Sequence, residues 1–264
     1  MYIDTHCHLN IMAKRKFETS LSIEHLAIIE KIIKKTSEKN IYKILTIATS
    51  LIETQNTMLI VKKHENVYGA IGIHPCDAKE NWKKEFDQIK NILPNKKIVA
   101  LGETGLDFFH KPFFAQRQID LFKAHIETAI EQNLPIIIHS RNAMDEVLKT
   151  IEPYKNESTG VFHCFSESAE IAKTILEWNF YMGFGGPITY PKNEQLRDTV
   201  KDLPLEAILL ETDAPFLPPQ EYRGKENHPC YIPIIAKEIA RIKNISVEEV
   251  ESATTKNAEA LFGI

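Results

Sequence analysis

The sequence predicts an α/β protein, a (β/α)8 TIM-like barrel in which eight parallel strands alternate with helices. The chain has 264 residues, 43% of them hydrophobic, which is enough for one large core of this type. Short β-rich runs alternate with longer helical patterns along the whole chain. Runs such as Ile136-Ile137-Ile138 are continuously apolar, as expected of parallel strands covered on both faces. No linker, repeat or low-complexity segment interrupts the pattern, so residues 1–264 are predicted to form a single domain.

The strand candidates are, in chain order, 2–5, 44–48, 67–71, 98–101, 136–138, 161–162, 180–183 and 207–210. Helices are predicted between them at 24–39, 53–64, 168–178, 194–203 and 232–242, with a last helix over 254–261 closed by Gly263. The clearest helix follows Pro112, where Ile119, Phe122, Ile126 and Ile130 form a core-facing stripe at spacings of three and four. An open doubly wound sheet is the alternative, but no Gly-rich phosphate turn follows the first strand.

Composition limits the classes of function. The formal net charge is -4 and the pI about 6.2, so no strong positive field holds a long duplex, and a nucleic-acid substrate would be bound locally. No apolar run is long enough to span a membrane, and no signal segment precedes the first strand, so the expected location is cytoplasmic. No obligate protein partner is expected.

The four cysteines form no CxxC pair, and a disulfide framework is not expected in such a chain. Each cysteine lies within two residues of a histidine, which raises the alternative of a mixed Cys/His zinc site. That alternative is disfavoured because Cys7 and Cys164 are direct neighbours of the predicted ligands below and would point to the opposite face of their strands.

Possible metal ligands stand at the ends of the predicted strands. His6 and His8 are two residues apart at the end of the first strand, so their imidazoles share a face and can reach one metal ion. Further candidates end later apolar runs, and in a barrel all these positions meet at one rim: Glu103, His139, His163 and Asp213.

Six ligands exceed the needs of one ion and suit two divalent ions bridged by a carboxylate. A water shared by the ions would become a bridging hydroxide near neutral pH and act as the nucleophile. Asp213 is predicted to take part in proton transfer as well as coordination. The donor set fits zinc, manganese, cobalt or nickel, and magnesium at lower affinity. A single histidine at a strand end could be purely structural, but six such residues at five strand ends are hard to explain in that way.

Several segments in register resemble the TatD family of metal-dependent hydrolases, from residue 2 to the C-terminal helix. They are Asp4-Thr5-His6-Cys7-His8-Leu9, Gly72-Ile73-His74-Pro75, Gly102-Glu103-Thr104-Gly105-Leu106-Asp107, His139-Ser140-Arg141, His163-Cys164-Phe165-Ser166 and Glu211-Thr212-Asp213-Ala214-Pro215. The resemblance implies a barrel of the amidohydrolase-like superfamily with nuclease-type phosphodiesterase activity. It also implies that His6, His8 and Asp213 hold one ion, that His139 and His163 hold the other, and that Glu103 bridges them.

Phosphate-binding residues are predicted around the same rim. His74 follows the third strand, and Arg141 follows His139 by two residues. A proline-rich loop after the eighth strand is predicted to hold Arg223 and Lys225 over the metals, and the resemblance favours Arg223. Asp107 and Glu211 are candidate partners that fix the tautomer of a ligand histidine. Departures from the family pattern at Asn142, Glu167 and Glu226-Asn227-His228 leave the ligands intact and are expected to affect substrate preference.

The leading functional prediction is a metal-dependent phosphodiesterase, a deoxyribonuclease that trims single-stranded DNA or RNA from the ends as a 3'-5' exonuclease. The modest charge favours single strands, and a rim site favours ends. Hydrolysis of an ester or amide bond, for example an aminoacyl ester of RNA, is the alternative. Superfamily members with amide substrates often bridge their metals with a carboxylated lysine, whereas Glu103 stands at that position here. A non-catalytic binding protein is the third reading, and the presence of all six ligands disfavours it.

Overall fold

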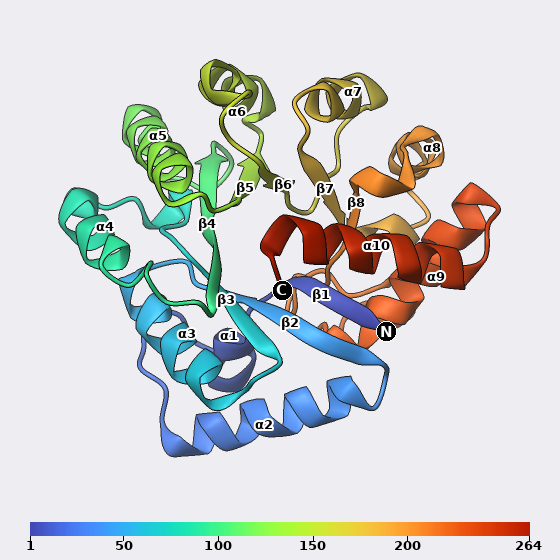
Figure 1. Cartoon of the computed structure of the whole chain (residues 1–264), viewed down its shortest axis with the longest axis horizontal. Helices are drawn as coiled ribbons and strands as arrows, with labels where there is room; N and C mark the ends of the chain where they lie inside the picture. The colour runs from blue at the N-terminus through green and yellow to red at the C-terminus, as the bar shows by residue number, and fades with distance from the viewer.

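The computed structural model describes all residues 1–264. Eight parallel strands pair in the order β1 to β8 and are ringed by helices (Figure 1). The strands are β1 (Tyr2–Cys7), β2 (Ile41–Ile47), β3 (Val67–Ile71), β4 (Ile98–Asp107), β5 (Ile136–Arg141), β6 (Gly160–Phe162), β7 (Tyr181–Phe184) and β8 (Ile208–Leu210). A parallel bridge between Cys7 and Ala214 joins the first strand to the segment after the last one. The predicted barrel is confirmed.

The surrounding helices are α1 (Leu9–Lys14), α2 (Ile23–Ser37), α3 (Leu51–Lys63), α4 (Trp82–Lys90), α5 (Ala115–Gln132), α6 (Met144–Ile151), α7 (Ala169–Glu177), α8 (Glu194–Asp202), α9 (Ile232–Lys243) and α10 (Val247–Phe262). Serine hydroxyls accept from backbone amides at the N-termini of several of them, among them Ser22, Ser50 and Ser168. In α5 the predicted stripe faces the core, with Phe122 and Ile126 fully buried. No helix has the length and apolar character needed to cross a membrane.

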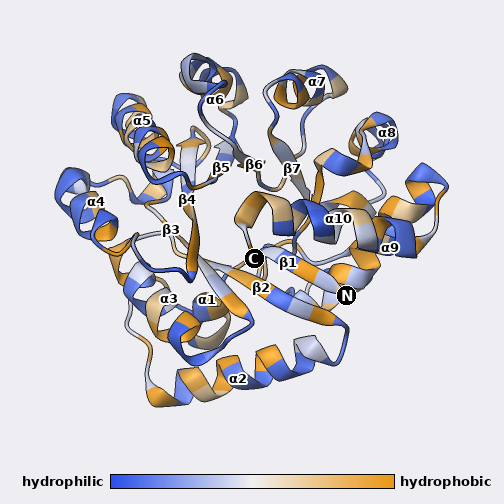
Figure 2. Ribbon diagram, in the orientation of Figure 1, coloured by the Kyte–Doolittle hydropathy of each residue, from blue (hydrophilic) through white to orange (hydrophobic).

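Two hydrophobic clusters build the core. The larger one lies between the strands and the helices, which show hydrophobic and hydrophilic faces in Figure 2. The smaller one includes inward-facing strand residues such as Ile3, Val99 and Leu209, and it continues onto Leu261 and Phe262 of α10. The dark red helix α10 therefore closes the end of the barrel at which β1 begins (Figure 1). The opposite, carboxyl-terminal rim remains for a site.

Several predicted boundaries need correction. β4 continues through Glu103 to Asp107, and β5 continues through His139 to Arg141, because Thr104 and Gly105 pair with Ile138 and His139. β1 ends at Cys7, so His8 lies one residue beyond it, at the N-cap of α1. Helices α1, α4 and α6 were not expected from the sequence pattern. The last helix begins at Val247, not at residue 254, because Ser246 and Glu249 form a capping box there.

Candidate metal centre

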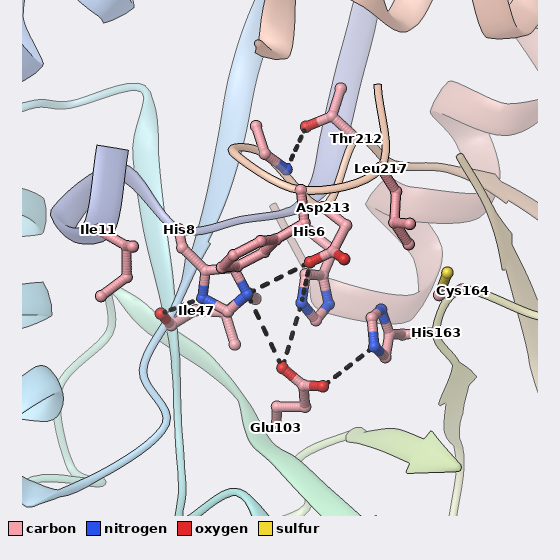
Figure 3. Close-up of polar contacts among 12 residues, drawn as sticks. His6, His8, Ile11, Ile47, Glu103, His163, Cys164, Thr212, Asp213 and Leu217 are labelled. Carbon is pink, nitrogen blue, oxygen red and sulfur yellow. Dashed lines mark hydrogen bonds and ion pairs between the residues drawn. The ribbon is translucent and has the colours of Figure 1, made fainter. Parts of the chain in front are cut away.

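The six predicted ligands converge at the carboxyl-terminal rim, around Glu103. Its Oε2 lies 3.4 Å from His6 Nε2 and 3.9 Å from His8 Nε2. Its Oε1 lies 2.8 Å from His139 Nδ1 and 3.0 Å from His163 Nε2. Figure 3 shows His6, His8 and Asp213 gathered on one side of Glu103 and His163 on the other. The two oxygens of one carboxylate thus face two groups of donors, which is the geometry that a bridging ligand needs.

Asp213 completes the first group. Its Oδ1 lies 3.4 Å from His8 Nε2 and 3.7 Å from His6 Nε2. Its backbone adopts a left-handed φ of 57°, which aspartate tolerates better than most residues. The Asp213 amide donates to the carbonyl of His6 at 2.8 Å. The pairing of β1 with the segment after β8, which closes the barrel, therefore also places Asp213 beside His6.

Unpartnered buried nitrogens show that the donors fit a metal. The His6 side chain is 1% exposed, and neither of its ring nitrogens has a hydrogen-bond partner. Such groups are rare in proteins and need an explanation, which an ion would supply for His6 Nε2. His8 Nδ1 lies 3.2 Å from the carbonyl of Ile47, a contact that places the ring hydrogen on Nδ1 and leaves Nε2 free to coordinate. Imidazole and carboxylate donors of this kind suit divalent transition metals.

The charges of the centre are strongly coupled. Burial by itself would raise the pKa of Glu103, but the imidazoles of His163 and His139 hold it well below its usual range. Burial likewise opposes the charged form of His163, yet Glu103 and Glu211 raise the pKa of this histidine well above its ordinary value. Without a metal, the positive charge of protonated imidazole balances the negative charge of the carboxylates. A divalent cation would take over that role and release protons on binding.

Asp4 is a structural part of this centre that the sequence reasoning did not single out. Its Oδ1 accepts from the amides of His6 (3.2 Å) and Thr212 (3.0 Å), and its Oδ2 accepts from the Thr212 hydroxyl (2.6 Å). Burial raises the pKa of Asp4 to about 8, against these hydrogen bonds. Asp4 therefore ties β1 to the segment carrying Asp213. The available signal was a carboxylate two residues before the first predicted ligand, His6, on the same strand.

Two glycines make room for the centre. Gly105 on β4 has a φ of +134°, and a Cβ there would lie 2.0 Å from the carbonyl oxygen of His139. A Cβ on Gly183 would lie 2.2 Å from Glu211 Oε2, so this glycine makes space for that carboxylate. The close approach of β4 to β5, which brings Glu103 and His139 together, thus requires a residue without a side chain at position 105.

Asp107 and Glu211 contact the far nitrogens of the second group. Asp107 Oδ2 lies 3.3 Å from His139 Nε2, and Glu211 Oε1 lies 3.4 Å from His163 Nδ1. Although burial opposes it, hydrogen bonds from His139 and the His110 amide hold the pKa of Asp107 below its usual range. Asp107 is therefore placed to orient His139, as the sequence suggested, whereas Glu211 lies near His163 Nδ1 without a hydrogen bond to it.

The predicted phosphate-binding residues fall into two sets. His74 and Arg141 line a cavity of about 570 Å³ that opens over the centre. His74 Nδ1 accepts from the Cys76 amide, so the ring hydrogen sits on Nε2, 3.7 Å from Glu103 Oε1. Burial and the neighbouring His139 lower the pKa of His74 to about 3, which makes it a neutral donor.

Arg223 and Lys225 are not among the residues that line the cavity. The Arg223 guanidinium lies over the ring of Tyr190, 4.5 Å from its centroid, and Lys225 Nζ lies 5.9 Å from the centroid of Tyr222. The loop after β8 therefore places neither cation on the wall of the cavity over the predicted ligands.

Two phenylalanines at the cavity mouth were missed. Phe17 and Phe216 are 51% and 37% exposed, and their rings are parallel within 5° with centroids 6.3 Å apart. Phe216 also contacts the His8 ring edge-on at 5.8 Å. A large apolar residue alone in a polar segment, as Phe17 is between Lys14 and Leu21, was the signal that could have identified this pair.

Comparison with known proteins agrees with this architecture. The model of the TatD-related DNase family matches residues 3–263. The metal-dependent hydrolase YabD of Bacillus subtilis is 36% identical over 265 residues, covering 100% of both chains. The metal-dependent hydrolase YcfH of Escherichia coli is 34% identical and covers 99% of this chain and 96% of its own. The crystal structure of YjjV, a TatD homologue from Escherichia coli, superposes with a TM-score of 0.90 at 27% identity, covering 100% of this chain and 98% of that one. The chain therefore belongs to the TatD-related DNase family.

Proposed function

We propose that this protein is a divalent-metal-dependent phosphodiesterase that removes nucleotides from the 3' ends of single-stranded DNA or RNA. The observation that carries the proposal is the two-sided carboxylate of Glu103, with one oxygen toward His6 and His8 and the other toward His139 and His163. Membership of the TatD-related DNase family supports a nucleic-acid substrate.

In this proposal, His6, His8 and Asp213 hold one ion, His139 and His163 hold the other, and Glu103 contacts both. Two bound divalent ions would supply Lewis acidity at a phosphoryl oxygen and lower the pKa of water. Asp213 lines the cavity, and His8 helps to hold its pKa below the ordinary value against the effect of burial. It is therefore an ionised acceptor placed to take the proton of the attacking water.

The chain's own donors account for phosphate binding. His74 presents a neutral Nε2–H toward Glu103 from the cavity wall. The Arg141 guanidinium also lines the cavity and is steadied by the ring of Phe109, 4.6 Å from its centroid. Arg223 and Lys225 lie outside the cavity and are proposed to contact only phosphates further along a strand.

The aromatic pair supports a single-stranded substrate. Bases stack on exposed aromatic rings only when they are not paired and stacked in a duplex, and one such contact contributes about 1–3 kcal/mol. Phe17 and Phe216 offer such a surface beside His8. The net charge of -4 provides no long positive track for a duplex backbone.

The test uses end-labelled single-stranded DNA and RNA with free or blocked 3' ends. Metal-stripped protein is supplied with Mg²⁺, Mn²⁺ or Zn²⁺ one at a time, beside an Asp213→Asn control. Stepwise, metal-dependent shortening of strands with free 3' ends only, absent in the control, is the expected result. Equal cleavage of blocked strands would refute the exonuclease assignment. Stoichiometric metal binding without any cleavage would favour hydrolysis of an ester or amide bond instead.

A further inference from the structure

A second group of metal-ligating side chains lies on the wall of the same cavity. Cys76 belongs to the short 3-10 helix Pro75–Asp77 after β3, Asp107 ends β4, and His110 follows in the next loop. One ligand atom from each of these three residues lies within 4.8 Å of the others. None of the three belongs to the six residues assigned to the two proposed ions.

The backbone holds Asp107 ready for such a role. Asp107 Oδ1 accepts from the amides of Phe109 and His110, both at 2.9 Å, which fixes the carboxylate. Its Oδ2 is left for side chains and lies 2.8 Å from His110 Nδ1. Asp107 is fully buried, whereas Cys76 and His110 are exposed to the cavity and can adjust by small side-chain rotations.

We propose that Cys76, Asp107 and His110 form an additional metal site for a zinc-like divalent ion. A thiolate, a carboxylate and an imidazole are the three donor types of zinc, and water from the cavity would fill the fourth position of a tetrahedral site. Binding displaces the Cys76 thiol proton to solvent and moves the His110 ring hydrogen to Nε2, so that Nδ1 coordinates. The thiolate favours zinc and cobalt over magnesium and manganese.

The position of the site links it to the centre around Glu103. Asp107 Oδ2 also lies 3.3 Å from His139 Nε2. The Asp107 carboxylate would therefore contact both the additional ion and His139, a proposed ligand of the dinuclear centre.

Cys76 is the cysteine placed for this chemistry. Cys7 and Cys230 are buried, and the Cys230 thiol donates to the carbonyl of Lys35. Cys164 is partly buried next to His163 and belongs to none of the ligand groups that the structure brings together. The sequence disfavoured a mixed Cys/His site because of Cys7 and Cys164. The structure instead brings Cys76, on the short helix after β3, within 4.8 Å of Asp107 at the end of β4.

Titration of the metal-stripped protein with Co²⁺ tests the proposal, because thiolate coordination gives a near-ultraviolet charge-transfer absorption that imidazole and carboxylate ligands do not. The wild type should show this band and bind one more equivalent of Co²⁺ or Zn²⁺ than the Cys76→Ser and His110→Gln variants. With Mn²⁺ the three proteins should bind the same number of equivalents. The Cys164→Ser variant is the matched control and should keep the band.

Absence of the band at saturating Co²⁺, or its loss in Cys164→Ser and survival in Cys76→Ser, would overturn the proposal. The comparison between variants does not depend on nuclease activity or on how many ions the centre around Glu103 holds. Failure here is therefore distinguishable from failure of the proposed function. Circular dichroism of the variants at exposed positions 76 and 110 should match the wild type.

Discussion

Breaking the buried ion pair between Lys14 and Glu53 should be one of the most destabilising single changes near the site. Lys14 Nζ donates to both Glu53 oxygens, at 2.8 and 2.7 Å, and each side chain is 1% exposed. Amide groups of Asn10, Asn56 and Glu18 donate to the same carboxylate. Lys14 lies in the last turn of α1, which begins directly after His8, so the pair anchors the segment that carries one predicted ligand.

At 2.7 Å the attraction between the charges is about 6 kcal/mol with an effective dielectric constant of about 20. Desolvation of the two ions offsets most of this, so the intact pair contributes little net free energy. Removing one partner leaves the other charge buried without a counter-charge, although its remaining hydrogen bonds persist. Lys14→Met or Glu53→Gln should therefore lower the free energy of unfolding by roughly 3–5 kcal/mol, whereas the double variant should lose much less than the sum.

Urea unfolding of the metal-stripped proteins measures these differences without a contribution from bound ions. The matched control is Lys63→Met, which breaks the pair of Lys63 and Glu30 at 3.0 Å with side chains 46% and 63% exposed. That change should cost at most about 1 kcal/mol. A loss below about 1 kcal/mol for Lys14→Met, or strict additivity in the double variant, would refute the reasoning.

Three further predictions concern the centre, the core and the substrate. Glu103→Gln should lower the metal content measured by mass spectrometry, since one change removes charge from both ligand groups; unchanged metal content would contradict the bridging role. Burial lowers the pKa of His125 from an ordinary 6.5 to about 4. As the pH falls, this histidine is therefore protonated in the unfolded state before it is protonated in the folded state. The free energy of unfolding should fall by roughly 3 kcal/mol as the pH drops from 6.5 to 4. His125→Gln should remove that part of the pH dependence in urea unfolding, and an unaltered profile would exclude His125 as its source. Phe17→Ala should raise KM for single-stranded oligonucleotides about tenfold with little effect on a small phosphodiester, whereas equal losses on both would argue against base stacking.

The strand centres and the candidate ligands were accessible from the sequence because both depend on local pattern. Apolar runs identify parallel strands, and the polar residue that ends each run marks the rim. The length of β4 was not accessible. Gly102-Glu103-Thr104-Gly105 reads as the end of a strand, yet pairing with Ile138 and His139 of β5 extends it to Asp107. That pairing joins residues far apart in the chain, so no local pattern contains it.

Helix α4 escaped prediction for a different reason. Its buried face consists of only Trp82, Phe86 and Ile89, and charged residues fill most of the rest of the helix. The three apolar residues are spaced by four and three, which is the period of a helix face, so the sequence did carry the signal, but over only two turns of a mostly charged segment. Packing of these side chains on neighbouring elements stabilises so short a helix.

The departures near residues 226–228 contact the loop after β8 and the segment that carries Phe17. Asn227 is 1% exposed, and its Nδ2 donates to the carbonyls of Thr212 (2.5 Å) and Phe216 (2.6 Å), on either side of Asp213. Stiffness of this loop was predicted from its prolines, but the direction of its side chains depends on partners such as Asn227 that prolines do not specify.

Glu226 contacts Arg15 at 3.1 Å, in the segment that carries Phe17. Because both side chains of that pair are mostly exposed, it adds little stability, and we expect it to bias the position of Phe17 beside Phe216. We therefore expect these departures to influence base stacking through the positions of the two rings, with the metal ligands unchanged.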